Sequence, residues 1–181
     1  MIYLALLRGI NVGGNNKINM QKLSLALTKA GLDGVKTYIN TGNIIFESPD
    51  LMAKDLERII RDVILDKFSL DIKVLIKSHS EIRAVAQAIP DYWVNDSDMK
   101  CDVMFLWDNY NSKSVVNSVT INKDVDNLIY SDGALIWQIQ RSNYRKSKMN
   151  KLISTDVYRN MTARNCNTVR KILEKMDEYT D

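Results

Sequence analysis

From residue 2 to residue 17 the chain reads IYLALLRGINVGGNNK. Its first six residues are apolar without interruption, which is typical of a central strand buried on both faces of a sheet. The polar, glycine-rich stretch that follows predicts a loop. Asn19 is then well placed to cap a helix whose apolar face runs from Met20 to Leu27 and which ends at Gly31. The chain therefore begins with a strand, a loop and a helix.

The next elements complete a β-α-β-β-α-β order. Two short strands, residues 35–40 and 43–47, are joined across Thr41-Gly42, which is a hairpin signal. An amphipathic helix follows, with a buried stripe from Met52 to Phe68, and residues 72–77 alternate as a strand does. Residues 1–78 therefore predict a split βαβ unit.

The same order of elements begins again after a linking helix that Pro90 stops. We predict an α+β fold of two ferredoxin-like halves, the second less regular. The first half would be residues 1–90 with the linking helix, and the second would be residues 91–181 with the C-terminal helix. The elements expected in the second half are strands at 101–107, 128–130, 134–140 and, weakly, 156–162, and helices at 112–119, 148–153 and 169–176.

Composition excludes several classes of protein. The 181 residues are 45% hydrophobic and 26% charged, which is ordinary globular usage. No apolar run approaches the ~18 residues that a membrane-spanning helix needs, so no membrane partner is expected. The N-terminus lacks the pattern of a signal peptide, and two cysteines are too few for a disulfide framework. We therefore expect a cytoplasmic protein. Its net charge of +3 indicates no partner by itself.

The topology places two Gly/Asn-rich loops at the same end of the first sheet. In a split βαβ sheet the loop after the first strand and the turn between the second and third strands share one edge. Successive backbone N–H groups before a helix N-terminus form a concavity that attracts anions. We therefore predict a small anionic, phosphorylated ligand. The predicted ligand-binding residues are Arg8, Asn11, Gly13, Gly14 and Lys17, then Thr41, Gly42 and Asn43, and finally Arg164 and Asn165 if the second half folds over that edge.

The same residues also fit a purely structural role, because Gly and Asn are used in any tight connection. The known phosphate motifs do not decide between the two. Asn15 stands at the lysine position of a P-loop and Asn16 at its Ser/Thr position, so hydrolysis of a nucleoside triphosphate is not expected. No group of side chains has metal-ligand spacing, no cofactor is indicated, and whether the protein is an enzyme stays open.

Two other functional classes remain. Nucleic acid is a possible partner of residues 141–171, where nine basic residues and one acidic residue are interleaved with tyrosines. A protein-interaction module is the other class, with Tyr92, Trp93 and Val94 as an exposed anchor. The oligomeric state is not indicated. His79, the single histidine, is expected to begin the linking helix rather than to act as a general base.

Three motifs carry a resemblance to a known family. RGINVGGNNK at residues 8–17, YINTGN at 38–43 and TARNCNT at 162–168 resemble the signatures of domain-of-unknown-function family 1697, a widespread bacterial group. The resemblance implies a cytosolic α+β protein of two ferredoxin-like halves and supplies no activity, cofactor or catalytic residue. The family usually has Ser where Thr41 stands and Trp where Cys166 stands, which argues against a shared thiol role for Cys166.

Overall fold

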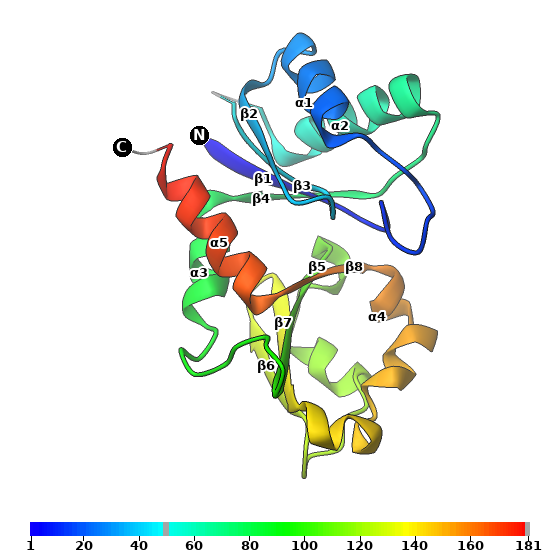
Figure 1. Cartoon of the computed structure of the whole chain (residues 1–181), viewed down its shortest axis with the longest axis vertical. Coiled ribbons are helices and arrows are strands. Elements are labelled where there is room, and N and C mark those ends of the chain that lie inside the picture. Colours follow the sequence, from blue (N-terminus) through cyan, green and yellow to red (C-terminus); the bar gives the residue numbers. More distant parts are fainter. Residues whose placement is uncertain (49–50, 180–181) are drawn as a thin grey trace. The chain divides into compact units, whose positions relative to one another are not determined.

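The computed structural model describes residues 1–48 and 51–179, and the chain forms two compact units (Figure 1). The first unit is Met1–His79 with the C-terminal stretch from Glu174, and the second is Ser80–Leu173. Each unit contains a four-stranded antiparallel sheet, and the two sheets repeat the same topological order. The predicted α+β class with two split βαβ halves is therefore confirmed.

The division between the units differs from the predicted one at residue 90. Almost all of the linking helix α3 (His79–Gln87) belongs to the second unit, and the end of the chain belongs to the first. Hydrogen bonds explain why the end of the chain belongs to the first unit. The hydroxyl of Tyr179 donates to the carbonyl of Gly34 at 2.5 Å, and His79 Nε2 lies 2.7 Å from Asp177 Oδ1. Such long-range contacts leave no local signal in the sequence.

The first sheet has the strand order β2-β3-β1-β4. Helices α1 and α2 lie on one face of it (Figure 1), and their apolar residues share one core with the strands. The buried residues of α2, Leu56, Ile60 and Ile64, recur every four positions as an amphipathic helix requires. The elements are β1 Ile2–Leu7, α1 Met20–Lys29, β2 Asp33–Tyr38, β3 Asn43–Glu47, α2 Ala53–Phe68 and β4 Val74–Ser78.

The capping residues in the sequence predicted both ends of α1 correctly, whereas the predicted start of α2 was too early. The side chain of Asn19 accepts a hydrogen bond from the backbone N–H of Lys22 at 2.9 Å, which confirms it as the N-cap. Gly31 follows the helix with φ of +95°. Met52, predicted in the buried stripe of α2, is 72% exposed. It precedes the first helical residue, so its side chain lies outside the periodic face.

The second sheet has the order β6-β7-β5-β8. One of its faces is covered by 3₁₀ segments and the short helix α4, whose apolar residues form a second core with the strands. This confirms the prediction of a less regular second half. The elements are β5 Met99–Leu106, η1 Asp108–Tyr110, η2 Lys113–Ser118, β6 Asn127–Ser131, β7 Ala134–Gln140, η3 Arg141–Lys146, η4 Met149–Ser154, α4 Asp156–Arg159, β8 Met161–Asn165 and α5 Cys166–Asp177.

The last strand lies later in the sequence than predicted. Residues 156–159 form α4, whose N-cap Thr155 accepts a hydrogen bond from the N–H of Tyr158, and β8 begins only at Met161. A single capped turn is too short to show helical periodicity, which explains the error. Across the described residues, every helix is either too short or too polar to cross a membrane.

Candidate functional site

The loop after β1 and the turn between β2 and β3 lie together, as the topology predicts. The backbone N–H of Leu7 donates to the carbonyl of Gly42 at 2.8 Å. The side-chain amide of Asn11 donates to the carbonyl of Asn40 at 2.8 Å. Two stretches about thirty residues apart are therefore joined by direct hydrogen bonds within the first unit.

Asn11 connects these two loops and closes the first. Its Nδ2 also donates to the carbonyl of Ile18 at 3.0 Å, and its Oδ1 accepts from the N–H of Ile18 at 2.9 Å. Its own N–H donates to Asn16 at 3.2 Å, and its φ is +52°. Asparagine suits this position because it tolerates left-handed backbone and offers both a donor and an acceptor.

Asn11→Ala is expected to destabilise the first unit by about 2 kcal/mol. The change leaves the N–H of Ile18 and the carbonyl of Asn40 without their partners, and alanine is less tolerant of a positive φ. Urea unfolding of the two variants would measure the loss, with the exposed Asn15→Ala as the matched control, expected within about 0.5 kcal/mol of the parent. Equal stability of the two variants would contradict this role.

The predicted residues of the turn have structural contacts of their own. Asn43 is fully buried, and its Nδ2 donates to the carbonyl of Tyr38 at 3.0 Å and to the hydroxyl of Thr41 at 3.2 Å. Gly42 has a φ of +81° and packs directly against β1. Any role of these three residues in ligand binding stays a prediction.

A groove of about 810 Å³ lies where the first loop meets the start of α1. Of the predicted residues, Asn11, Gly14 and Lys17 line it, while Arg8 and Gly13 lie outside its lining. The backbone N–H of Arg8 donates to the carbonyl of Lys73 at 3.0 Å. Sequence reasoning missed the other residues of the lining, of which Asn19, Gln21, Lys22 and Asn40 are polar.

The groove has a positive electrostatic character. Lys17 and Lys22 are exposed along it, and the first turn of α1 contains no acidic residue. The positive end of the helix dipole is therefore not offset by a side chain of that turn. Within the described residues, the backbone N–H groups of Gly13 and Gly14 have no protein acceptor. These groups are free to meet an anion or water.

Arg164 and Asn165 belong to β8 of the second unit, so a part in the first unit's groove stays a prediction. Arg164 is buried, and this burial lowers the pKa of its guanidinium to about 10. Its Nη1 donates to the Thr162 hydroxyl at 3.1 Å and to the Ala163 carbonyl at 2.7 Å. Asn165 Oδ1 accepts from the N–H of Thr168 at 2.8 Å, which is the geometry of a helix cap.

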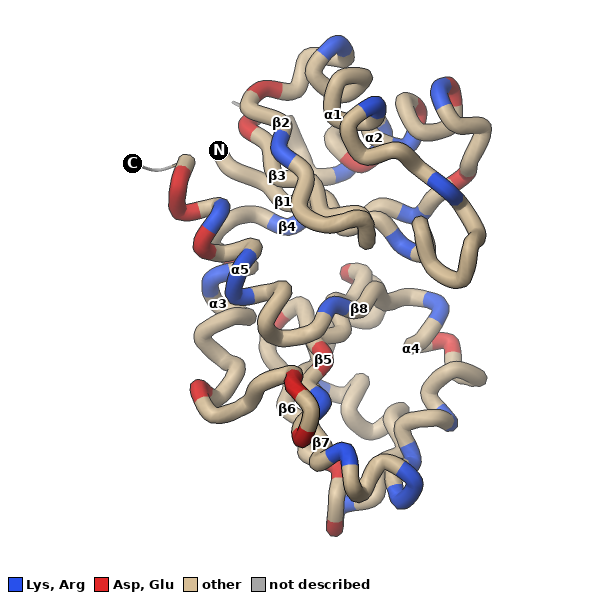
Figure 2. The backbone as a smooth tube through the Cα atoms, in the orientation of Figure 1, with Lys and Arg blue, Asp and Glu red and all other residues tan. Residues whose placement is uncertain are grey.

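The basic residues of segment 141–171 are spread over several elements (Figure 2), and not all of them are exposed. Arg170 donates to the carbonyls of Trp93 and Pro90, and Arg159 pairs with Asp156. Arg164, as described above, is buried. Arg141 of η3 is exposed but donates to the carbonyl of Asp96 at 2.7 Å. The other exposed cations of η3 and η4 are Arg145, Lys146 and Lys151, with Lys148 between the two segments. Nucleic-acid binding by the segment stays a prediction that now rests on these four residues.

The predicted protein-interaction anchor is wrong at its central residue. Trp93 is only 6% exposed, whereas Tyr92 is 74% exposed. Trp93 is held inside the second unit, where its carbonyl accepts from Arg170 at 2.8 Å. Its position next to an acidic, polar segment gave no indication of this burial.

The two cysteines are buried and unpaired by a disulfide. A hydrogen bond between the two thiols raises the pKa of Cys101, and the burial of Cys101 raises it further. The same hydrogen bond lowers the pKa of Cys166, assisted by the positive charge of Arg170. Among the described residues, no three His, Cys, Asp or Glu side chains are grouped so that they could hold a metal ion.

Sequence reasoning also missed the buried carboxylate of Asp126. Its Oδ1 accepts from the Ser147 hydroxyl at 2.6 Å and the Trp137 indole N–H at 3.0 Å. Its Oδ2 accepts from the backbone N–H groups of Asn122 at 2.8 Å and Lys148 at 3.2 Å. Burial alone would raise the pKa of Asp126, but the hydrogen bonds outweigh it and hold the pKa below its usual value.

Comparison with known proteins agrees with this architecture. A family model described as protein of unknown function (DUF1697) matches residues 1–137. Among solved structures, the chain is similar to the conserved bacterial protein SP0830 from Streptococcus pneumoniae, with 29% identity and a TM-score of 0.81 over 97% of this chain and 98% of that one. No curated protein matches the chain. The match to most of the sequence shows that the chain belongs to the DUF1697 family.

Proposed function

We propose that the first unit binds a small anionic, phosphorylated ligand in the groove between the β1–α1 loop and the start of α1. The observation that carries this proposal is the composition of the groove. Two lysines, the N-terminus of a ten-residue helix and several amide groups surround it, and no carboxylate occurs among its described lining residues. A phosphate group would supply the negative charge that this end of the helix favours.

Each group has a distinct part in this proposal. Lys17 and Lys22 attract the anion as flexible point charges. The N–H group of Gly14, which lines the groove, is able to donate a hydrogen bond to its oxygens, because glycine allows close approach of the backbone. Asn11 and Gly42 do not contact the ligand in this proposal; they hold together the two loops that form the site. Within the motif at residues 8–17, the supporting residue Asn11 therefore lies close in sequence to the binding residues Gly14 and Lys17.

Thermal unfolding in the presence of phosphate compounds tests the proposal. Inorganic phosphate, pyrophosphate and ribose 5-phosphate are the probes, each at rising concentration. A compound present at a hundredfold excess over its Kd raises the stability of the native state by ~2.7 kcal/mol, which corresponds to roughly 5–10 °C in Tm for a protein of this size. We expect such a shift for at least one probe in the parent protein.

A double variant separates binding from general salt effects. Lys17→Gln with Lys22→Gln is expected to abolish the shift, because both charges of the groove are removed. Lys123→Gln, an exposed lysine of the second unit, serves as the control and should respond as the parent does. A shift of equal size in all three proteins, or no shift with any probe, would refute binding at this groove.

We also infer a reducing compartment, such as the bacterial cytoplasm, as the setting of this function. Two buried thiols that remain unpaired support this inference, because free cysteines are usual in reducing compartments. The similarity to a conserved bacterial protein supports the bacterial origin.

A further inference from the structure

The second unit contains a pocket of about 620 Å³ between its sheet and the 3₁₀ segments that cover it. The floor is one face of the sheet, with Met104 of β5, Trp137 of β7 and Met161 of β8. The cover includes Met149 and Leu152 of η4. A volume of this size lies within the range of small-molecule sites, which are mostly apolar cavities with a few placed polar groups.

Three aromatic side chains line this pocket. The rings of Trp137 and Tyr144 lie with centroids 6.3 Å apart and planes tilted by 52°, and Tyr158 contributes from α4. Tyr144 is 53% exposed, so a large part of its surface is not covered by the protein. Aromatic rings at this spacing offer faces and edges to a further planar ring.

A small number of charged groups share the pocket with these rings. Lys100 Nζ pairs with Asp102 Oδ2 at 2.7 Å, and both side chains are mostly buried, with 26% and 22% exposed. The same Lys100 Nζ lies 5.8 Å from the ring centroid of Trp137. Arg145 lines the pocket from η3 and is exposed to solvent. The lining therefore holds two cations and one carboxylate, a net positive charge.

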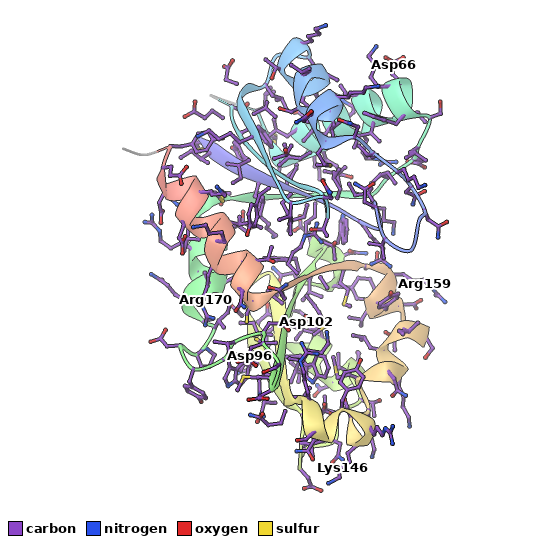
Figure 3. The ribbon with its side chains drawn as sticks, in the orientation of Figure 1. Asp66, Asp96, Asp102, Lys146, Arg159 and Arg170 are labelled. Atoms are coloured by element: carbon purple, nitrogen blue, oxygen red, sulfur yellow. The ribbon has the colours of Figure 1, made fainter. Side chains whose placement is uncertain are left out.

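The buried carboxylate of Asp126 gives this pocket a fixed shape. It accepts hydrogen bonds from the indole N–H of Trp137 and from Ser147 and Lys148, which connect η3 to η4. One ionised group thus ties the floor of the pocket to its cover. Sites of small-molecule recognition are usually preformed in this way. Figure 3 labels Asp102, which lies on β5 and lines the pocket, and Lys146, the last residue of η3.

We propose that this pocket binds a planar aromatic small molecule that carries one acidic group. The ring would lie against Trp137, Tyr144 and Tyr158, and the acidic group would pair with the guanidinium of Arg145, which suits a planar carboxylate or phosphate. Asp102 would accept a hydrogen bond from an amino or hydroxyl substituent of the ring. The occupant and the site differ from those proposed for the first unit.

Calorimetric titration with three matched probes tests this assignment. The probes are 1-naphthoate, which has ring and charge, 1-naphthalenemethanol, which lacks the charge, and cyclohexanecarboxylate, which lacks the aromatic ring. All titrations use the Lys17→Gln, Lys22→Gln background, so that the first unit's groove does not contribute. We expect a Kd below about 1 mM for 1-naphthoate and affinities about tenfold weaker for the other two probes.

Two substitutions locate the binding. Arg145→Gln should weaken 1-naphthoate about tenfold and leave 1-naphthalenemethanol unchanged, because it removes only the charge-assisted contact. Tyr144→Leu should weaken both aromatic probes about fivefold. Lys151→Gln, also exposed on the cover but outside the lining, is the control and should change neither. Both Arg145 and Tyr144 are exposed, so the variants should unfold at the parent's Tm, which is measured first.

The proposal is overturned by any of three results. The first is the absence of saturable 1-naphthoate binding by the Lys17→Gln, Lys22→Gln protein. The second is equal binding by the Arg145→Gln, Tyr144→Leu and Lys151→Gln proteins. The third is binding of single-stranded RNA, with an affinity that falls steeply with salt and is lost with these substitutions, while the small probes do not bind. That last result would assign the exposed cations of η3 and η4 to nucleic acid.

Discussion

Gly42→Ala is expected to destabilise the first unit by about 3 kcal/mol, a large share of the stability of a domain. Gly42 has a φ of +81°, which side-chain-bearing residues rarely adopt. A Cβ added there would lie 2.7 Å from the Cβ of Leu7 and 3.0 Å from two atoms of Ile10. Both neighbours belong to the core, with exposures of 0% and 1%, so the backbone rather than a flexible side chain must move.

Gly13→Ala is the matched control for this substitution. Gly13 also has a positive φ, +59°, but no atom lies within 4 Å of its added Cβ. Only the backbone strain remains, so the expected cost is about 1 kcal/mol. Urea unfolding of both variants, followed by a probe of the first unit, separates the two contributions. Equal losses at the two glycines would show that close approach to β1 is not what requires Gly42.

Asp126→Asn is expected to cost the second unit about 3 kcal/mol at neutral pH. The substitution keeps the shape of the side chain but removes the charge and turns one acceptor into a donor. That donor would face N–H groups which now donate to Asp126 Oδ2, those of Asn122 and Lys148. Chemical denaturation at pH 7 measures the loss. Asp124→Asn, exposed two residues away, is the control and should stay within about 0.5 kcal/mol of the parent.

The same carboxylate makes the stability of the second unit depend on pH. Because the pKa of Asp126 is lower in the folded protein than in the unfolded chain, its contribution is complete above the unfolded value of about 3.9. The contribution decreases as the pH falls toward and through the folded pKa. The stability difference between parent and Asp126→Asn should therefore shrink in acid. A difference that stays constant down to pH 3 would contradict the assignment.

The structure separates two roles among the residues of the motifs at 8–17 and 38–43. Asn11, Gly42 and Asn43 have buried contacts or hydrogen bonds that explain their residue types without a ligand. Gly14 and Lys17 are exposed on the groove and make no such contacts, although the φ of +82° at Gly14 itself favours glycine. From residue type alone, all five were predicted to bind the ligand, because Gly and Asn occur in tight turns and in ligand contacts alike. The distinction matters for mutagenesis, since changes at the first group test folding and changes at the second test binding.

The sequence by itself determined the order of strands and helices in the first half, the cap at Asn19 and the common edge of the two loops. These features depend on periodicity and capping within about four residues, and on the few ways in which a split βαβ unit connects. Only the tertiary structure decided that Trp93 is buried, that Asp126 joins Trp137 to Ser147, and that a pocket lies beneath η3 and η4. Those features depend on partners that are distant along the chain, and the burial that creates them leaves no pattern among neighbouring residues.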